Sequence, residues 1–439
     1  MFKTLNINYL LILFFYLTLG CSETDFKREK EEKPEPEESE ESITEELQTT
    51  ILGKIIAGYQ GWYNAVGDGQ NLGWKHYLID GEFEPGSCSI DYWPDMSEMT
   101  AGEKYPTPFA HADGSVAHVF SSANATTVSR HFEWMKDYGI DGVFVQKFLS
   151  AMKNANRYEN QSEVFAHCYQ AATANDRFIG VMYDLSGVAG ADLDYLIDDW
   201  KAMVDTYNLL DENNENYLTY NRKPIVAIWG VGFKNRNYSI DDVNEVVEFL
   251  KNDPQYGGCT VLLGVPTYWR EQINDCIPDA GFHTLLKQAD IIHPWFVGRI
   301  NNLNQADAFA ARYTADKAWC DDYDLKYMPV VFPGFSWHNL KRGEVQQESI
   351  PRLQGDFYWR QLYNVMDSGA ETVYVAMFDE MDEGTCIFKC TDNPPIGESP
   401  FVTYEGLPSD YYLWLTGKAT EMLRGEIPLS VTKPQYPGL

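Results

Sequence analysis

The strongest constraint on the fold is a short apolar segment that recurs eight times, with amphipathic segments between most of the copies. Each apolar segment has the length of a strand, whereas the segments between place apolar residues at helical intervals. Alternating strands and helices predict a parallel sheet, and eight repeats favour a closed (β/α)8 TIM barrel. An open, doubly wound sheet is the alternative, because closure cannot be read from a sequence.

The strand segments are 55–62, 142–147, 178–184, 224–230, 260–266, 290–295, 327–333 and 372–378. The helical segments are 128–138, 162–174, 193–207, 240–250, 306–319 and 357–368, and a closing helix is expected within 400–424.

The first 50 residues differ from the rest in composition. Residues 1–20 hold Lys3 and an apolar run too short to span a membrane, which is typical of an export signal. Gly20 precedes Cys21, as in bacterial lipoproteins whose cysteine is lipidated; ordinary secretion is the alternative. Residues 21–50 are rich in glutamate and predict a disordered acidic tether. We therefore expect one barrel over 51–430, exported to the periplasm or cell surface as an outer-membrane lipoprotein, with the lipid as its only membrane contact.

Charge and aromatic content limit the class of ligand. A formal net charge of −31 argues against nucleic acid and anionic lipid, because phosphates require a basic surface. Aromatic residues make up 14% of the chain, and the apolar faces of sugars stack on aromatic rings. Composition therefore favours a neutral carbohydrate as the substrate, and we expect a monomer.

In a barrel of this type the active site lies at the C-terminal ends of the strands. Polar and aromatic residues recur at these ends, although each one alone could instead be a packed core residue. Those predicted to bind substrate are Tyr59, Trp62, Gln146, Lys147, Tyr183, Asp184, Trp229, Trp269, His293, Trp295, Arg299, Trp337, His338, Asn339 and Asp379. The insertion 63–124 is a candidate wall of the site; the alternative for its rings, Trp74, His76, Tyr77, Tyr92 and Trp93, is a local core.

Four carboxylates follow the last predicted strand within five residues: Asp379, Glu380, Asp382 and Glu383. At the rim of a core, partial burial and like-charge crowding raise some carboxyl pKa values and leave others low. Separate pKa values for an acid and a base are what glycoside hydrolysis needs. A calcium loop or a charged strand end is the alternative.

No cofactor and no catalytic metal are expected. The acidic cluster lacks the spacing of an EF-hand, and no His and Cys residues have the spacing of a zinc site. Seven cysteines follow Cys21, an odd number, with Cys386–Cys390 and Cys259–Cys276 as candidate disulfides.

The acidic segment also carries a family resemblance. Residues 378–385, Phe-Asp-Glu-Met-Asp-Glu-Gly-Thr, resemble the Glu-x-x-Glu-Gly-Thr motif that ends the last barrel strand in glycoside hydrolase family 99 and its relatives in family 71. Segments 58–62, 333–339 and 409–417 resemble the same group. The chain differs at Asp379, Met381 and Asp382, where family 99 usually has Asn, Trp and His, and so fits the wider 71/99-like branch better.

The resemblance implies a retaining, endo-acting enzyme for an α-linked poly- or oligosaccharide, mannan- or glucan-like. It implies that Glu380 is the base that deprotonates the substrate 2-hydroxyl, and that Glu383 is the acid/base at the glycosidic oxygen. Both can reach one sugar only if the chain turns near Met381, because residues three apart in a strand face opposite ways. The alternatives are a non-catalytic surface glycan-binding lipoprotein and an exo-acting xylosidase- or arabinosidase-type enzyme.

Overall fold

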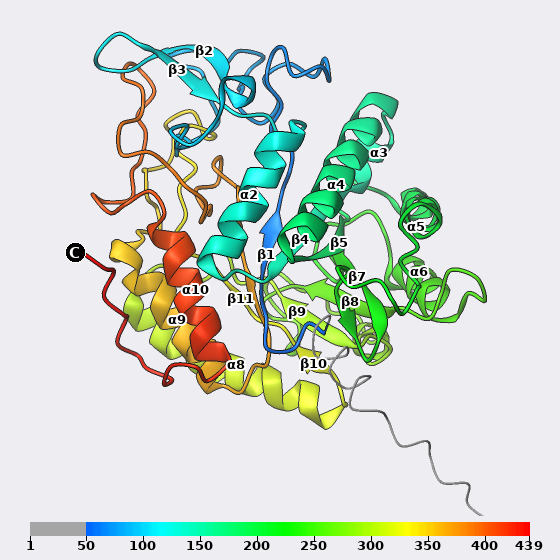
Figure 1. Cartoon of the computed structure of the whole chain (residues 1–439). Coiled ribbons are helices and arrows are strands. Elements are labelled where there is room, and N and C mark those ends of the chain that lie inside the picture. Colours follow the sequence, from blue (N-terminus) through cyan, green and yellow to red (C-terminus); the bar gives the residue numbers. More distant parts are fainter. Residues whose placement is uncertain (1–49) are drawn as a thin grey trace, which may run out of the picture.

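The computed structural model describes residues 50–439 (Figure 1). The predicted signal peptide, the lipidated Cys21 and the acidic tether through residue 49 lie outside the described residues. Within 50–439, no helix has both the length and the apolar character needed to cross a membrane.

Parallel strands form the barrel in the order predicted from the sequence. Neighbouring strands pair in sequence order from β1 through β9, and β1 pairs with β12. The strands are β1 (Ile55–Tyr59), β4 (Gly142–Phe148), β5 (Phe178–Asp184), β7 (Lys223–Trp229), β8 (Thr260–Val265), β9 (Ile291–Pro294), β10 (Lys326–Tyr327), β11 (Val330–Val331) and β12 (Val373–Val375).

The seventh strand closes the barrel in two halves. β10 pairs with β9, and β11, three residues later, pairs with β12. Pro329 lies between the halves; it has no N–H to donate, but its carbonyl accepts the N–H of Tyr374 at 3.0 Å. The predicted closed (β/α)8 barrel is therefore confirmed.

Helices surround the barrel, with α8, α9 and α10 side by side and α2 against α4 (Figure 1). They are α2 (Ala125–Tyr138), α3 (Leu149–Met152), α4 (Ala155–Asn175), α5 (Asp194–Tyr207), α6 (Ile240–Asn252), α7 (Phe282–Leu286), α8 (Leu303–Asp322), α9 (Asp356–Asp367) and α10 (Tyr411–Leu423). Smaller elements are β2 (Tyr105–Ala110), β3 (Val116–Val119), β6 (Thr219–Tyr220), η1 (Ala101–Glu103), η2 (Gly190–Leu193) and η3 (Leu353–Gly355).

Local signals explain where these helices begin and end. Asn124 caps α2 by accepting the N–H groups of Thr126 and Thr127, and Gly139 ends the helix in the left-handed conformation at φ 73°. Between the caps, Val128, Phe132 and Met135 face the barrel and are fully buried.

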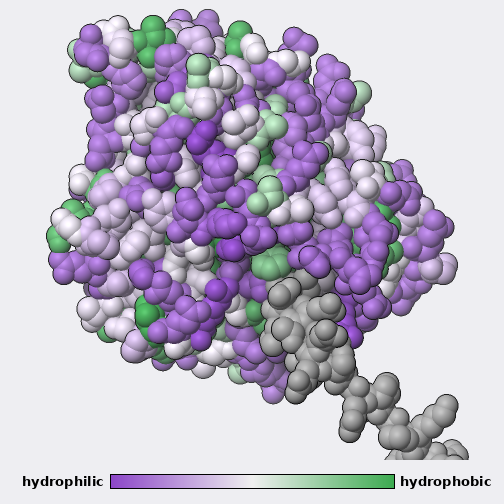
Figure 2. All heavy atoms as spheres, in the orientation of Figure 1, coloured by the Kyte–Doolittle hydropathy of each residue, from purple (hydrophilic) through white to green (hydrophobic). Residues whose placement is uncertain are grey.

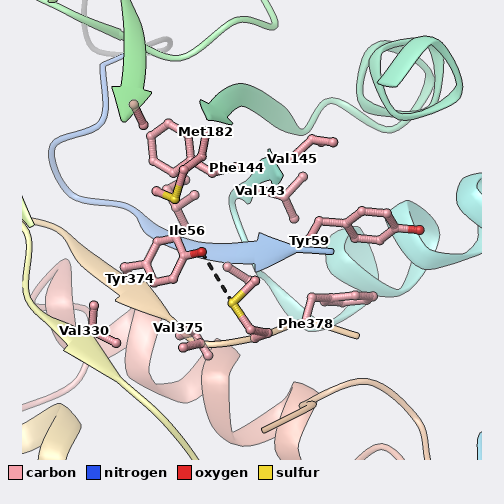
Figure 3. Close-up of a cluster of buried hydrophobic side chains, with 14 of the residues drawn as sticks. Ile56, Tyr59, Val143, Phe144, Val145, Met182, Val330, Tyr374, Val375 and Phe378 are labelled. Carbon is pink, nitrogen blue, oxygen red and sulfur yellow. Dashed lines mark hydrogen bonds between the residues drawn. The ribbon is translucent and has the colours of Figure 1, made fainter. Parts of the chain in front are cut away.

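The barrel interior is a packed core. Side chains from β1, β4, β5, β11 and β12 meet there, among them Ile56, Phe144, Met182, Val330 and Tyr374 (Figure 3). Each is at most 1% exposed, and burial of such a side chain contributes about 1.5–3 kcal/mol. The outer surface in the same view as Figure 1 is mainly hydrophilic (Figure 2).

Candidate active site

A cleft of about 670 Å³ opens at the C-terminal ends of the strands. Glu380 and Glu383 both line it, together with side chains from the ends of the first four strands. We call this space the catalytic cleft; its lining residues are Gln60, Trp62, Gln146, Phe148, Met182, Asp184, Ser186, Trp229, Trp295, Met377, Glu380 and Glu383.

A tight turn after β12 brings the two glutamates to one side of the chain. Residues 381–384 form the turn, and the Glu380 carbonyl accepts the N–H groups of Thr385 and Cys386, both at 3.1 Å. Gly384 has φ 65°, and a Cβ there would lie 2.8 Å from the Ser336 backbone. The turn near Met381 that the predicted pairing requires is present, and glycine is the residue that permits it.

Glu380 is held on both carboxylate oxygens. Gln60 Nε2 donates to Oε1 at 2.8 Å, and Thr385 Oγ1 donates to Oε2 at 2.6 Å. Only 5% of the residue is exposed. Burial raises the pKa of Glu380 well above its usual value, the charge of Glu383 raises it further, and the two donors oppose the shift. Both donors favour the ionised form.

Glu383 is positioned through its backbone, and its carboxylate accepts no hydrogen bond from residues 50–439. Its carbonyl accepts the Ser336 N–H at 2.9 Å. Burial, with the charge of Asp382 beside it, raises the pKa of Glu383 to about 7, while Lys341 lowers it. The carboxyl group is therefore suited to give and take a proton near neutral pH.

The other two acids of the cluster build the site. Asp379 accepts the N–H groups of Gln60 and Gly61 at 2.7 and 2.9 Å, which ties the end of β1 to the end of β12. Burial raises the pKa of Asp379 to about 7. Asp379 itself does not line the catalytic cleft, so the structure gives it a supporting place rather than the predicted contact with substrate.

Asp382 connects the turn of residues 381–384, which we call the acidic turn, to the insertion 63–124. It accepts a hydrogen bond from the Tyr63 hydroxyl at 2.9 Å and lies 3.3 Å from His76 Nδ1. The His76 ring in turn stacks on Trp62, with ring centroids 3.9 Å apart and planes 4° apart. His76 thus contacts the acidic turn, whereas Tyr77, Tyr92 and Trp93 are buried in the hydrophobic core and Trp74 packs against it.

Aromatic rings form the walls of the catalytic cleft. Trp62 stacks on Phe148 with centroids 5.2 Å apart, and Trp229 meets Trp295 edge to face at 5.4 Å. Trp229 Nε1 is buried and has no hydrogen-bond partner within residues 50–439. Five of the predicted substrate-binding residues therefore share the cleft: Trp62, Gln146, Asp184, Trp229 and Trp295.

Lys147 and Tyr183 lie on the other face of the sheet, which corrects their predicted place. Successive strand residues alternate in direction, so Gln146 and Asp184 enter the cleft while their neighbours face the helices. There Lys147 Nζ and the Tyr183 hydroxyl bind the two carboxylate oxygens of Asp199, at 2.6 and 2.8 Å.

Tyr59 and His293 are sealed in the core. The Tyr59 hydroxyl is 2.9 Å from His131 Nδ1, and His293 Nδ1 is 3.0 Å from the Met328 carbonyl. Both residues are 0% exposed. Burial lowers the pKa of His131 to about 3 and of His293 to about 4, so both imidazoles stay neutral. The prediction that Tyr59 and His293 contact substrate does not agree with this burial.

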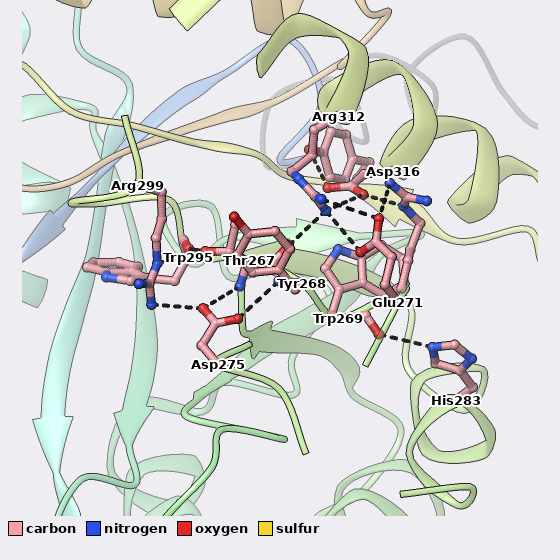
Figure 4. Close-up of polar contacts among 12 residues, drawn as sticks. Thr267, Tyr268, Trp269, Glu271, Asp275, His283, Trp295, Arg299, Arg312 and Asp316 are labelled. Carbon is pink, nitrogen blue, oxygen red and sulfur yellow. Dashed lines mark hydrogen bonds and ion pairs between the residues drawn. The ribbon is translucent and has the colours of Figure 1, made fainter. Parts of the chain in front are cut away.

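Trp269 and Arg299 belong to a separate polar network between loops (Figure 4). Trp269 is fully buried against Trp319, and Arg299 pairs with Asp275 at 2.8 Å. Neither lines the catalytic cleft, so the structure assigns them to loop architecture rather than the predicted contact.

The segment 336–339 binds the acidic turn through the hydrogen bond from the Ser336 N–H to the Glu383 carbonyl. Asp91, from the insertion, accepts the N–H groups of His338 and Asn339, both at 2.8 Å. Trp337 packs on Phe335 with centroids 5.0 Å apart. The predicted binding residues Trp337, His338 and Asn339 therefore lie outside the cleft and hold the loop whose Ser336 binds Glu383.

A second space of about 690 Å³ adjoins the cleft. The two share Gln60, Trp62, Gln146 and Phe148, and we call the second the side compartment. It contains residues that sequence reasoning missed: Lys75 from the insertion, and Arg157 and Gln161 from α4. The sequence indicates this part of the site only through the position of the insertion 63–124, directly after the first strand.

Within residues 50–439 the structure shows neither a metal-binding cluster nor a disulfide bond. Among residues 50–439, no group of three or more His, Cys, Asp or Glu is arranged to hold a metal ion. The seven cysteines of this range are free thiols, which does not support either candidate disulfide; Cys386 and Cys390 Sγ lie 3.7 Å apart.

Comparison with known proteins supports the fold. No protein-family model and no curated protein matches the chain. Two structures of a family 99 endo-alpha-mannosidase from Bacteroides thetaiotaomicron, one in complex with BIS-TRIS-propane, align with TM-scores of 0.60 and 0.62 at 15% identity, over 86% of this chain and 99% of that chain. A glycoside hydrolase-like protein aligns with a TM-score of 0.52 at 14% identity, over 78% of this chain and 96% of that chain. The predicted resemblance to family 99 is thus confirmed at the level of the fold.

Proposed function

We propose that the protein is a retaining glycoside hydrolase that cuts an α-linked poly- or oligosaccharide, mannan- or glucan-like, within the chain. The observation that supports this most is the pair Glu380 and Glu383, which line one cleft at the C-terminal end of a closed barrel. The fold neighbours include an endo-alpha-mannosidase, which favours an α-linked substrate. Incubation with a panel of polysaccharides, followed by a reducing-end assay, tests the proposal.

The proposed chemistry follows from what each carboxyl group contacts. On an α-mannosyl unit, whose 2-hydroxyl lies on the face of the ring opposite the leaving oxygen, Glu380, with two donors on its carboxylate, takes the proton of that hydroxyl, and the 2-oxygen attacks the anomeric carbon. The glycosidic bond breaks as Glu383 gives its proton to the leaving oxygen, which leaves a 1,2-anhydro sugar. Water then opens that ring at the anomeric carbon, giving its proton to Glu383, and the 2-oxygen regains a proton from Glu380.

The walls of the cleft fit a sugar chain. Trp62, Trp229 and Trp295 offer flat apolar faces, and Gln146 and Asp184 offer hydrogen bonds to hydroxyl groups. The space continues past Trp62 into the side compartment, so a polymer has room on both sides of the scissile bond. Chromatographic sizing of the products separates internal from terminal cleavage; release of single sugars alone would favour the exo-acting alternative.

The pH dependence follows from Glu383. Its pKa is raised to about 7, and it must carry a proton when the leaving group departs, so activity should fall as the pH rises above about 7. Asp382→Asn removes a charge that raises this pKa and should move the alkaline limb to lower pH. Rates measured from pH 4 to 10 check both; a wild-type limb above pH 9 would contradict the role of Glu383.

We also propose that the chain is exported and lipid-anchored at Cys21, with the acidic tether between anchor and barrel. The support is the short apolar run before Gly20-Cys21 and the glutamate-rich stretch after it. In a bacterial host, the wild-type protein should partition with membranes and incorporate labelled palmitate. Cys21→Ala should abolish both, and label in the variant equal to the wild type would exclude this anchor.

A further inference from the structure

The side compartment carries an unusual charge for this protein. The chain has 65 Asp and Glu residues, yet none of those within residues 50–439 lines this space. Its charged side chains are Lys75 and Arg157, and its other residues are neutral or histidine. The catalytic cleft next to it holds Asp184, Glu380 and Glu383. Two adjoining compartments therefore differ in the sign of their charge.

Lys75 and Arg157 are also unpaired. Neither forms an ion pair with any residue of 50–439, whereas Arg130, Arg270 and Lys389 each have a carboxylate partner. Arg157 is exposed in the first turn of α4, and Lys75 is partly buried on the insertion. Placing two cations around one space without a counter-ion is unfavourable, so a negatively charged occupant would relieve their repulsion.

Gln161 adds a neutral hydrogen-bond donor to the side compartment. Gln161 Oε1 accepts the Phe148 N–H at 3.2 Å, which fixes the amide and leaves Nε2 buried without a partner in the described part of the chain. A buried donor without a partner is rare in a protein interior and is satisfied when a ligand supplies an acceptor oxygen. Two cations and an amide N–H suit an oxyanion better than a hydroxyl group.

We propose that the side compartment is a binding subsite for an anionic sugar, one that carries a carboxylate or a sulfate ester. This inference rests on the proposed function, because the compartment shares Gln60 and Trp62 with the catalytic cleft, and Gln60 also binds Glu380. A polymer cut at the glutamates would place its neighbouring residue here. The charged subsite then selects polymers with an anionic sugar, and the aromatic rings of the catalytic cleft bind the neighbouring sugar by stacking.

Binding to dextran, dextran sulfate and carboxymethyl-dextran tests the proposal, since the three share an α-linked backbone and differ in charge. Affinity is measured by gel retardation with Glu380→Gln protein, so that cleavage does not interfere. Because the protein has a net charge of −31, non-specific attraction to an anionic polymer is not expected. Tighter binding to one or both charged polymers than to dextran is the expected result, and the preferred polymer distinguishes sulfate from carboxylate.

Adding Lys75→Gln and Arg157→Gln to the Glu380→Gln protein should weaken its binding of the preferred charged polymer about tenfold or more. Its binding of dextran should stay unchanged. Lys223→Gln, at the N-terminal end of β7 and therefore the opposite end of the barrel, is the matched control and should have no effect. Equal affinity of the parent protein for all three polymers, or no loss in the double variant, would overturn the subsite. The reducing-end assay on neutral polysaccharides tests the glutamates independently.

Discussion

Replacing either Glu380 or Glu383 with glutamine should lower the rate of glycosidic cleavage by about 10²–10⁴-fold, the usual contribution of a positioned acid or base. Glutamine keeps the shape of the side chain and removes its ability to exchange a proton. Glu380→Gln should prevent activation of the 2-hydroxyl, and Glu383→Gln should prevent protonation of the leaving oxygen. The rate of reducing-end release by purified protein measures both effects.

Stability separates lost chemistry from lost folding in these variants. The folded state raises the pKa of both carboxyl groups, so their ionisation costs stability as the pH rises through the folded pKa values. At pH 8 each glutamine variant should therefore unfold at a temperature equal to or above that of the wild type. Glu344→Gln, an exposed glutamate in the neighbouring loop, is the control and should keep full activity. Full activity in both active-site variants would remove the catalytic assignment.

Replacing Arg352 with methionine should cost about 3 kcal/mol or more in the free energy of unfolding. The guanidinium is 1% exposed and donates to the Tyr92 hydroxyl at 2.9 Å and to the carbonyls of Gly384 and Cys386 at 3.0 and 2.7 Å. It also packs on the faces of Tyr92, Tyr404 and Tyr412, with centroid distances of 4.5–4.8 Å. Methionine fills part of the space but removes the donor of the Tyr92 hydroxyl and the Gly384 carbonyl, and it leaves the Cys386 carbonyl with only the Tyr404 hydroxyl, at 3.4 Å.

Because Gly384 and Cys386 lie one and three residues after Glu383, the same substitution should also disturb the turn that orients the catalytic pair. Urea unfolding measures the stability, and the catalytic rate under conditions where the variant is folded measures the second effect. Arg342→Met is the matched control: its pair with Asp80 is mostly exposed and screened by solvent, so its loss should leave the free energy of unfolding almost unchanged. A small change in Arg352→Met would show that Arg352 does not support the turn.

Much of the scaffold was predictable because strand and helix periods are local properties. All eight strands were expected, and so were the helices α2, α4, α5, α6, α8, α9 and α10. Closure was not readable, because it depends on a strand split at Pro329 that pairs with β9 before the proline and with β12 after it. The short α7 has too few residues to show a helical period.

The site was predicted well only where the chain is regular or the motif is local. Gln146 and Asp184 enter the cleft while Lys147 and Tyr183 face Asp199, an alternation that a stricter use of the strand period would have predicted. Residues in loops have no such period. The buried place of Trp269 depends on contacts made across the fold.

The side compartment and the contact of His76 with Asp382 also depend on long-range contacts. The insertion 63–124 folds over the barrel and brings His76 to the acidic turn, some 300 positions later in the sequence, and Lys75 to the side compartment. The His76 imidazole of the insertion lies 3.3 Å from the Asp382 carboxylate. No local pattern in the sequence predicts such a contact.

Proton NMR of the anomeric signals during incubation with α-linked mannans tests the central claim most directly. If Glu380 and Glu383 act through a 1,2-anhydro sugar, the first new reducing ends should have the α configuration and mutarotate afterwards, and the Glu380→Gln/Glu383→Gln protein should produce none. First-formed β ends would contradict the retaining route. Binding of these glycans without any new reducing end would show that the barrel is a glycan-binding protein rather than an enzyme.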